Sequence, residues 1–170
     1  MSFSRFSLSL SSKTLLQYEH SDYEEALRLA TLEAQKGDAY AQSCLGIIYN
    51  HGFGVEVDYK KAFELFQKSA LQGNYYGQKN LGDCYYEGEG AEKNFSEAFK
   101  WYMKAAEQGY ADAQNNLGVI FAIQQDFATA FKWFKTAAEN GSETSQCALG
   151  DMYKNGDGVE KNWQMHSNGI

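Results

Sequence analysis

Apolar residues recur at helical spacing along most of the chain, in segments of two alternating kinds. In the segment at 38–50 they fall at i, i+4, i+7 and i+8, which places them on one face of an α-helix. These residues are Ala41, Leu45, Ile48 and Tyr49. In the segment at 60–72, small residues alternate at helical spacing with large ones such as Phe66, and small residues let a neighbouring helix approach closely. The pattern predicts antiparallel helix pairs.

A block of sequence repeats in register, with a period of 36 residues twice and then of 32. It begins with Ala-Gln-x-x-Leu-Gly or a close variant, at residues 41–46, 77–82, 113–118 and 145–150. A fixed period of this length is typical of stacked repeats, in which each unit buries its apolar face against its neighbours. First helices are predicted at 38–50, 75–87, 111–123 and 143–154. Second helices are predicted at 22–36, 59–72, 95–108 and 127–140.

Pairs of glycines come directly after three of the predicted first helices, as in Gly52-Phe53-Gly54. Glycine readily adopts the left-handed conformation that closes a helix, so we interpret these pairs as loop geometry. A phosphate-binding loop would need a preceding strand and a subsequent Lys-Ser/Thr, and the sequence offers neither here. The third unit is four residues shorter, and residues 121–127 replace the longer connector. We expect a tight turn there, like that of a tetratricopeptide repeat.

Together these residues resemble the Sel-one-like repeat (SLR) family, a close relative of the tetratricopeptide repeats. The resemblance rests on Ala-x-x-x-Leu-Gly-x-x-Tyr-x-x-Gly-x-Gly-Val, then Lys-Ala-Phe, then Trp-Tyr-x-x-Ala-Ala-x-x-Gly, and covers residues 38–162. It implies an all-α fold, a right-handed α/α superhelical solenoid of antiparallel helix pairs with a concave groove. It also implies a role as an adaptor in protein assemblies, protein quality control or bacterial–host signalling.

The repeat register also predicts how the chain is organised. It gives a partly disordered N-terminal tail at 1–20, an N-terminal half-repeat at 21–37, repeats at 38–73, 74–109 and 110–141, a truncated repeat at 142–162 and a C-terminal tail at 163–170. The first residues are rich in serine and free of acidic residues, so a targeting segment stays open beside a simple polar tail.

Composition narrows the possible partners. The net charge of −7 disfavours nucleic acid and anionic membrane surfaces. No apolar run is as long as a membrane span, so we expect no membrane insertion. The three cysteines, Cys44, Cys84 and Cys147, do not form a repeating disulfide framework. This usage fits a reducing compartment, and we expect a cytoplasmic protein.

Residues that often carry chemistry are present without the spacing that chemistry needs. The three histidines are far apart, and the sequence holds no Cys-x-x-Cys, His-Glu-x-x-His or Gly-x-Ser-x-Gly motif. Cys84 shares its repeat phase with two isoleucines, so we interpret it as a buried apolar residue. We interpret one aromatic stripe as helix packing rather than a base-stacking surface: Trp101, Tyr102, Trp133 and Phe134. We therefore expect no enzyme activity and no metal or other cofactor.

A candidate binding surface can be derived from helix geometry and from the resemblance. At 100° per residue, positions 43, 47 and 50 point away from the apolar face of their helix. In the family, first helices line the concave surface, so we expect these positions and their equivalents to line a groove. The candidates are Ser43, Ile47, Asn50, Lys79, Asp83, Tyr86, Asn115, Val119, Ala122, Asp151 and Lys154. The alternative is that they are solvated positions without a partner.

The pattern as a whole indicates a non-catalytic scaffold or adaptor that binds a peptide or helix of another protein. Two alternatives stay open: a structural module that self-associates, and a truncated fragment of a longer repeat protein. The helix at 145–153 lacks the second helix that would cover it, and only Trp163 and Met165 are near enough to fold over it. We expect weak homodimer formation or partner binding through residues 145–165, with local opening there first.

Overall fold

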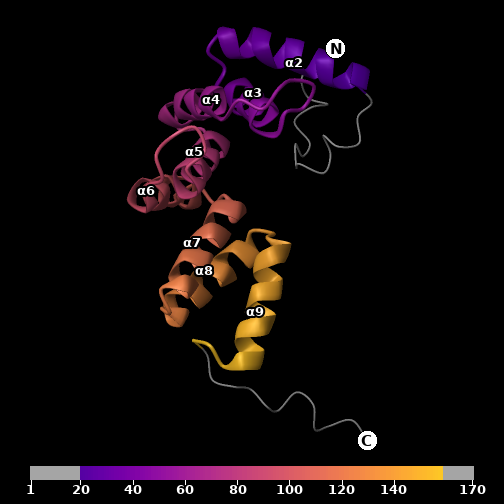
Figure 1. Ribbon diagram of the computed structural model, residues 1–170. Coiled ribbons are helices and arrows are strands. Elements are labelled where there is room, and N and C mark those ends of the chain that lie inside the picture. The colour runs from indigo at the N-terminus through magenta and orange to yellow at the C-terminus, as the bar shows by residue number, and fades with distance from the viewer. Residues whose placement is uncertain (1–19, 159–170) are drawn as a thin grey trace, which may run out of the picture. The chain divides into compact units, whose positions relative to one another are not determined.

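The computed structural model describes residues 20–158, with side chains from residue 23 onward. This range forms eight α-helices and no strand (Figure 1). The helices are α2 (His20–Gln35), α3 (Ala39–His51), α4 (Tyr59–Leu71), α5 (Tyr75–Glu87), α6 (Phe95–Glu107), α7 (Ala111–Ile123), α8 (Phe127–Glu139) and α9 (Glu143–Asn155). Each begins and ends within two residues of its predicted range, so the prediction of an all-α solenoid of helix pairs is confirmed. Residues 1–19 and the predicted tail at 163–170, with Trp163 and Met165, lie outside the described range.

The helices belong to two compact units, whose boundary falls inside α6, between Ala98 and Phe99. In unit 1, successive helices pack in chain order: α2 on α3, α3 on α4 and α4 on α5, while α3 also contacts α5. In unit 2, α7 packs on α8 and α8 packs on α9. In both units these helices therefore pack on their neighbours along the chain, as in a repeat array. None of the helices in the described range is long and apolar enough to cross a membrane.

Short polar residues fix where the helices begin, and glycines fix where several of them end. The Asp38 carboxylate accepts a hydrogen bond from the Ala41 N–H at 2.6 Å, and the Asn74 side-chain oxygen accepts one from the Gly77 N–H at 3.0 Å. Such caps satisfy N–H groups that have no partner within the helix. At the other end of α3, Gly52 has a φ of 71° in the left-handed region. The interpretation of the connector glycines as loop geometry is confirmed.

The shortened repeat closes with a different turn. Helix α7 ends at Ile123 and α8 begins at Phe127. Gln125 adopts the left-handed conformation, with a φ of 63°, and its N–H donates to the Ala122 carbonyl at 3.0 Å. The Asp126 carboxylate then caps α8 by accepting from the Thr129 N–H at 3.1 Å. The predicted tight turn is therefore confirmed, with glutamine in the conformation that glycine adopts elsewhere in the chain.

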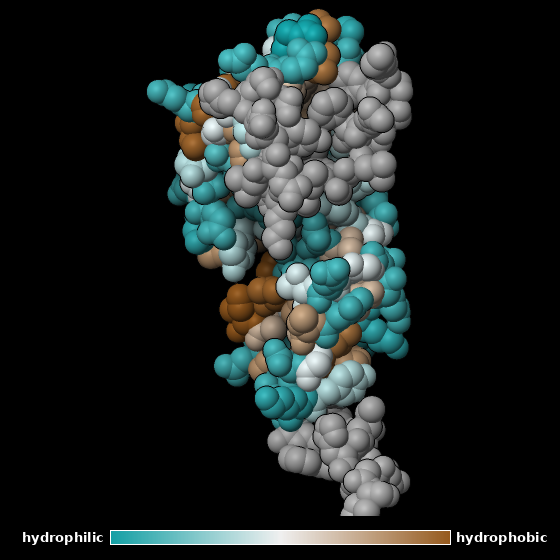
Figure 2. Space-filling view, turned by 90° about the vertical axis from the view of Figure 1, so that its right-hand side faces the viewer, coloured by the Kyte–Doolittle hydropathy of each residue, from teal (hydrophilic) through white to brown (hydrophobic). Residues whose placement is uncertain are grey.

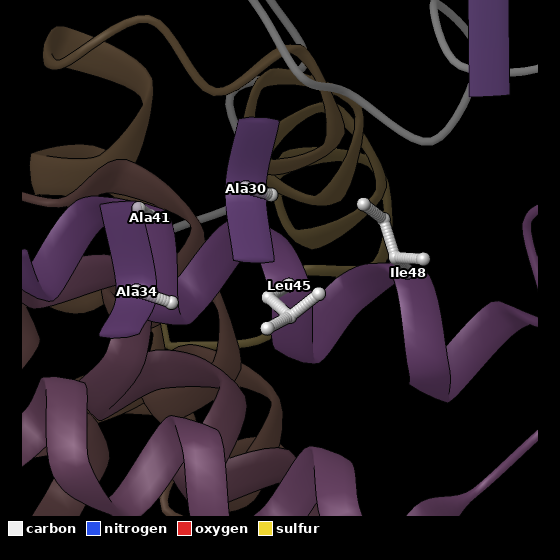
Figure 3. Packing of buried hydrophobic residues seen from close by; sticks show 5 residues of the cluster. All are labelled: Ala30, Ala34, Ala41, Leu45 and Ile48. Atoms are coloured by element: carbon white, nitrogen blue, oxygen red, sulfur yellow. The ribbon is translucent and has the colours of Figure 1, made fainter. Parts of the chain in front are cut away.

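Small residues bring the helices close together. Figure 3 shows Ala30 and Ala34 of α2 facing Ala41 and Leu45 of α3, in a cluster that also contains Ile48. Four of these five side chains are less than 8% exposed, so they form the core between the two helices. Burying a large apolar side chain such as leucine stabilises a fold by about 1.5–3 kcal/mol.

A glycine in the first helix lets an aromatic ring of the next helix pack directly on the backbone. A Cβ atom on Gly46 would lie 2.6 Å from the Phe66 ring, and one on Gly118 would lie 2.7 Å from the Phe134 ring. Carbon atoms in favourable contact are about 3.5–4.0 Å apart, so any side chain at these positions would push the helices apart. The aromatic stripe interpreted as helix packing is confirmed, since three members are buried and Trp133 is half-buried: Trp101, Tyr102 and Phe134.

A repeated glutamine links three of the first helices, α3, α5 and α7, to the end of the second helix before each of them. Its side-chain Nε2 donates a hydrogen bond to a backbone carbonyl one residue from the end of that helix, where carbonyls have no partner within their own helix. The pairs are Gln42 with Ala34 at 3.3 Å, Gln78 with Ala70 at 3.4 Å and Gln114 with Ala106 at 3.0 Å. All three glutamines are buried.

Two of these glutamines, Gln42 and Gln114, also contact the next second helix along the chain. The Gln42 side-chain oxygen accepts a hydrogen bond from Nε2 of Gln72, the C-cap residue of α4, at 2.8 Å. The Gln114 oxygen accepts one from Nδ2 of Asn140, which ends α8, at 2.9 Å. One side chain therefore joins the C-terminal ends of two second helices, and we call this arrangement the glutamine clamp.

Loss of the clamp should destabilise the fold in a position-dependent way. Gln114→Ala removes two hydrogen bonds, one to the Asn140 amide and one to the Ala106 carbonyl, which keeps the Gly109 N–H as a donor. At about 0.5–1.5 kcal/mol for each bond, we expect a loss of about 1–3 kcal/mol in the free energy of unfolding. Gln146 occupies the same repeat phase but is exposed, so Gln146→Ala should stay within about 0.5 kcal/mol of the unmodified chain. Urea denaturation of both variants measures the difference. Equal effects would show that the clamp does not stabilise the fold.

Candidate functional site

The predicted groove residues lie in both units and differ in their surroundings. Unit 1 holds Ser43, Ile47, Asn50, Lys79, Asp83 and Tyr86. Unit 2 holds Asn115, Val119, Ala122, Asp151 and Lys154. Figure 2 shows hydrophobic side chains in small patches among hydrophilic ones on the face that it displays. The burial and contacts of each predicted residue decide whether it is accessible.

Ser43 lies between helices. Its side chain is only 1% exposed, and its hydroxyl lies 2.7 Å from the Ser69 hydroxyl of α4. The Ser43 hydroxyl also donates toward the Asn74 side-chain oxygen at 3.3 Å. Asn115, in the same repeat phase, is half-buried, and its side-chain oxygen accepts from the Ser145 hydroxyl at 2.8 Å. Ser43 and Asn115 therefore join helices to each other, and the Ser43 side chain is not part of an exposed surface.

The accessible side of α3 is centred on Tyr40, Cys44 and Ile47, which succeed one another at i, i+4 and i+7 and are all half-buried. On the adjacent helix α5, the Tyr76 ring lies 5.6 Å from the Tyr40 ring in an edge-to-face arrangement. Tyr75 adds a third ring, 4.4 Å from that of Tyr76. Sequence reasoning missed these tyrosines. The available signal was that Tyr40 and Tyr76 share one repeat phase.

Charged residues lie further along the same side of α5. Lys79 Nζ and an Asp83 carboxylate oxygen are 2.6 Å apart, and the two side chains are 23% and 34% exposed. The tyrosine surface, as we call it, consists of Tyr40, Cys44 and Ile47 of α3, with Tyr75, Tyr76, Lys79 and Asp83 of α5. Asn50 is also half-buried. Tyr86 instead packs edge-to-face on Phe95, with ring centres 5.3 Å apart.

Unit 2 presents an aliphatic surface in place of the tyrosines. Val119 of α7 is 40% exposed, and Ile123, one turn later, is 65% exposed. Ala122 is half-buried and packs against the core between α8 and α9. On α9, Asp151 and Lys154 are exposed. Sequence reasoning missed Ile123, because it was assigned to the shortened connector.

Comparison with known proteins identifies the repeats. The family model described as Sel1 repeat matches residues 39–74, 76–110, 111–142 and 144–164. These matches cover well over half of the chain. The chain belongs to the Sel1 repeat family. Sel1 repeat proteins are commonly protein–protein interaction scaffolds and are generally non-catalytic. None of the curated proteins searched matches the chain.

Solved structures agree with this assignment. A protective antigen of uropathogenic Escherichia coli strains, which displays an SLR fold, is 35% identical over 81% of this chain, with a TM-score of 0.73. A Sel1 repeat protein from Oxalobacter formigenes is 36% identical over 74% of the chain, with a TM-score of 0.67. Helicobacter pylori cysteine rich protein B is 27% identical over 53% of the chain and 68% of its own length, with a TM-score of 0.50. The chain spans only 30% and 51% of the length of the first two proteins.

The three cysteines of this Sel1 repeat chain are free and differ in accessibility. Cys84 is 1% exposed, which confirms its interpretation as a buried apolar residue, and burial raises the pKa of its thiol to about 12. Burial also raises the pKa of the Cys44 thiol to about 12, although a hydrogen bond with Tyr40 partly opposes this shift. Cys147 is exposed. Since the thiolate is the nucleophile, Cys44 and Cys84 are poor nucleophiles at neutral pH.

Alkylation should therefore distinguish the cysteines. At pH 8, a thiol with a pKa of about 12 is ionised on the order of once in 10⁴ molecules, and raising the pH toward 9 leaves it largely protonated. We expect iodoacetamide to modify Cys147 of the folded chain and to leave Cys44 and Cys84 unmodified until urea unfolds it. Peptide mass spectrometry locates the labels. Modification of Cys84 as fast as Cys147 in the folded chain would contradict this burial.

Proposed function

We propose that the chain is a non-catalytic scaffold that binds a peptide or helix of a partner protein on the tyrosine surface. The interaction role that is common in the Sel1 repeat family supports this proposal. A cytoplasmic location, a protein partner rather than nucleic acid and a role outside the membrane belong to the same proposal. The three free cysteines and the net charge of −7 support them.

The observation that carries the proposal is the pair of half-buried tyrosines on adjacent first helices. The Tyr40 and Tyr76 rings are in contact at 5.6 Å, so each restricts the other before any partner binds. Tyrosine offers a large contact area and a hydroxyl group at a low cost in side-chain entropy, and aromatic residues are enriched in protein interfaces. The helices beneath hold both rings on a rigid backbone.

The polar residues beside the tyrosines add hydrogen-bonding groups to the surface. The Lys79–Asp83 ion pair is only partly exposed, and it offers one donor group and one acceptor group to a partner backbone or side chain. Such a pair contributes to specificity more than to affinity. The aliphatic residues Val119 and Ile123 give unit 2 a second, different contact surface on a first helix.

Binding should depend on Tyr76 and not on a more exposed tyrosine elsewhere. Ligands for the purified chain are selected from a displayed peptide library, and their affinities are measured by calorimetry. We expect Tyr76→Ala to weaken binding by about tenfold or more, the effect of losing an aromatic anchor worth about 1.4 kcal/mol or more. Tyr59, on the second helix α4, is 42% exposed and is the matched control, so Tyr59→Ala should leave affinity unchanged.

Thermal melts of both variants show whether the fold is retained at the assay temperature. Unchanged affinity for a folded Tyr76→Ala variant would contradict the tyrosine surface as the binding site. A selection that yields no ligand at all would contradict the scaffold function.

A further inference from the structure

Helix α9 differs from the other first helices in its neighbours. In the described range, α3 is succeeded by α4 and α7 by α8, and each of these pairs is in contact. Helix α9 packs on the preceding helix α8, and it is the last helix of the described range. The residues through which α3 contacts α4, and α7 contacts α8, can therefore be compared with their equivalents in α9.

The side of α9 that faces away from α8 carries residues whose equivalents in other repeats are buried between helices. In α3, the residues that contact α4 include Gln42, Ser43 and Gly46, all buried. Their equivalents in α9 are Gln146, Cys147 and Gly150, all exposed. No described atom lies within 4 Å of the place where a Cβ of Gly150 would be. We call these three α9 residues the open face.

The opposite side of α9 is firmly packed. Met152 is 6% exposed in a cluster with Ala130 and Phe134 of α8. The Tyr153 ring lies edge-to-face on Phe131, with centres 5.4 Å apart. The helix is also capped at its start, because the Ser142 hydroxyl accepts from the Ser145 N–H at 3.2 Å. The open face is therefore held on an ordered helix and continues the register of the α7–α8 interface.

The other repeats show which chemistry fills this place. Each occupying helix presents an alanine, an aromatic residue four positions later, a small residue three after that, and a side-chain amide three further on. These residues are Ala62, Phe66, Ser69 and Gln72 in α4, and Ala130, Phe134, Ala137 and Asn140 in α8. The aromatic ring packs on the glycine, and the amide donates to the clamp glutamine.

We propose that the open face of α9 binds an amphipathic helix of a partner protein that carries this Ala-x-x-x-aromatic-x-x-small-x-x-Gln/Asn pattern. The aromatic ring packs over Gly150, the small residue lies against Cys147, and the terminal amide donates to the Gln146 side-chain oxygen. The bound helix thereby continues the array by one element. This surface lies in unit 2 and is independent of the tyrosine surface in unit 1.

The test uses the full chain and a peptide of known packing chemistry. The probe is a fluorescent peptide of residues 58–73, which contains all of α4 with its capping residues. A lactam between Lys60 and Glu64, both exposed in α4 and spaced i, i+4, holds it helical, because short free helices are marginal in water. The control peptide carries Phe66→Ala. Fluorescence polarisation measures affinity, and alkylation of Cys147 gives a second, local readout.

We expect one peptide to bind per chain and to protect Cys147 from alkylation, with the control peptide at least tenfold weaker. Gly150→Leu should weaken binding by tenfold or more without lowering the melting temperature of the chain. Its side chain enters open space, and leucine favours helix more than glycine does. Gly118→Leu is the matched comparison for stability and should lower the melting temperature, because its Cβ would meet the Phe134 ring.

Three results would overturn the proposal. The first is an unmodified chain that does not bind the peptide at concentrations up to about 1 mM. The second is equal binding by the folded Gly150→Leu variant. The third is a dimer in light scattering that Gly150→Leu dissociates and the peptide does not, which would assign the face to a second copy of the chain.

Discussion

The architecture depends on the glutamine clamp, because one buried side chain satisfies the ends of two helices at once. The carbonyls that the glutamines contact also accept from the N–H of a glycine just past the helix, so each glutamine adds a second hydrogen bond at that helix end, worth about 0.5–1.5 kcal/mol. A glutamine amide has both a donor and an acceptor. Gln42 therefore donates to Ala34 in the helix before it and accepts from Gln72 in the helix after it. A leucine of similar size would fill the space and make neither of these hydrogen bonds.

The clamp fixes how a first helix is aligned along the next second helix, and the nearby glycine fixes the distance between the two helices. Gly118 lies four residues after Gln114 on the same helix, so both contact α8 from adjacent turns. The Phe134 ring can occupy the space over Gly118 only at one height along the helix, and at that height Asn140 reaches Gln114. Apolar packing and polar satisfaction thus require the same alignment of the two helices. This agreement explains how a short repeat without disulfides specifies a single packing arrangement.

The sequence predicts the helices well because their signals are local, whereas the surface depends on how neighbouring helices meet. Apolar periodicity and capping residues lie within each helix, and Cys84 was correctly interpreted because isoleucines share its phase. A helical wheel gives the direction of Ser43 relative to its own apolar face but does not show that Ser69 lies against it. Tyr40 and Tyr76 were missed for the converse reason. Large aromatic residues resemble core positions, and only the packing of α3 on α5 leaves them half exposed.

Comparison of repeats within this one chain separates residues that maintain the fold from those available for recognition. The clamp phase holds glutamine in all four repeats, at 42, 78, 114 and 146, although only the first three are buried. The phase of Tyr40 holds tyrosine, tyrosine, aspartate and threonine in turn, and that of Ile47 holds isoleucine, aspartate, valine and aspartate. Packing requires one residue type in every repeat, whereas a partner contacts each repeat at a different point. Variation at these exposed phases is therefore what allows a uniform scaffold to present an aromatic surface in unit 1 and an aliphatic surface in unit 2.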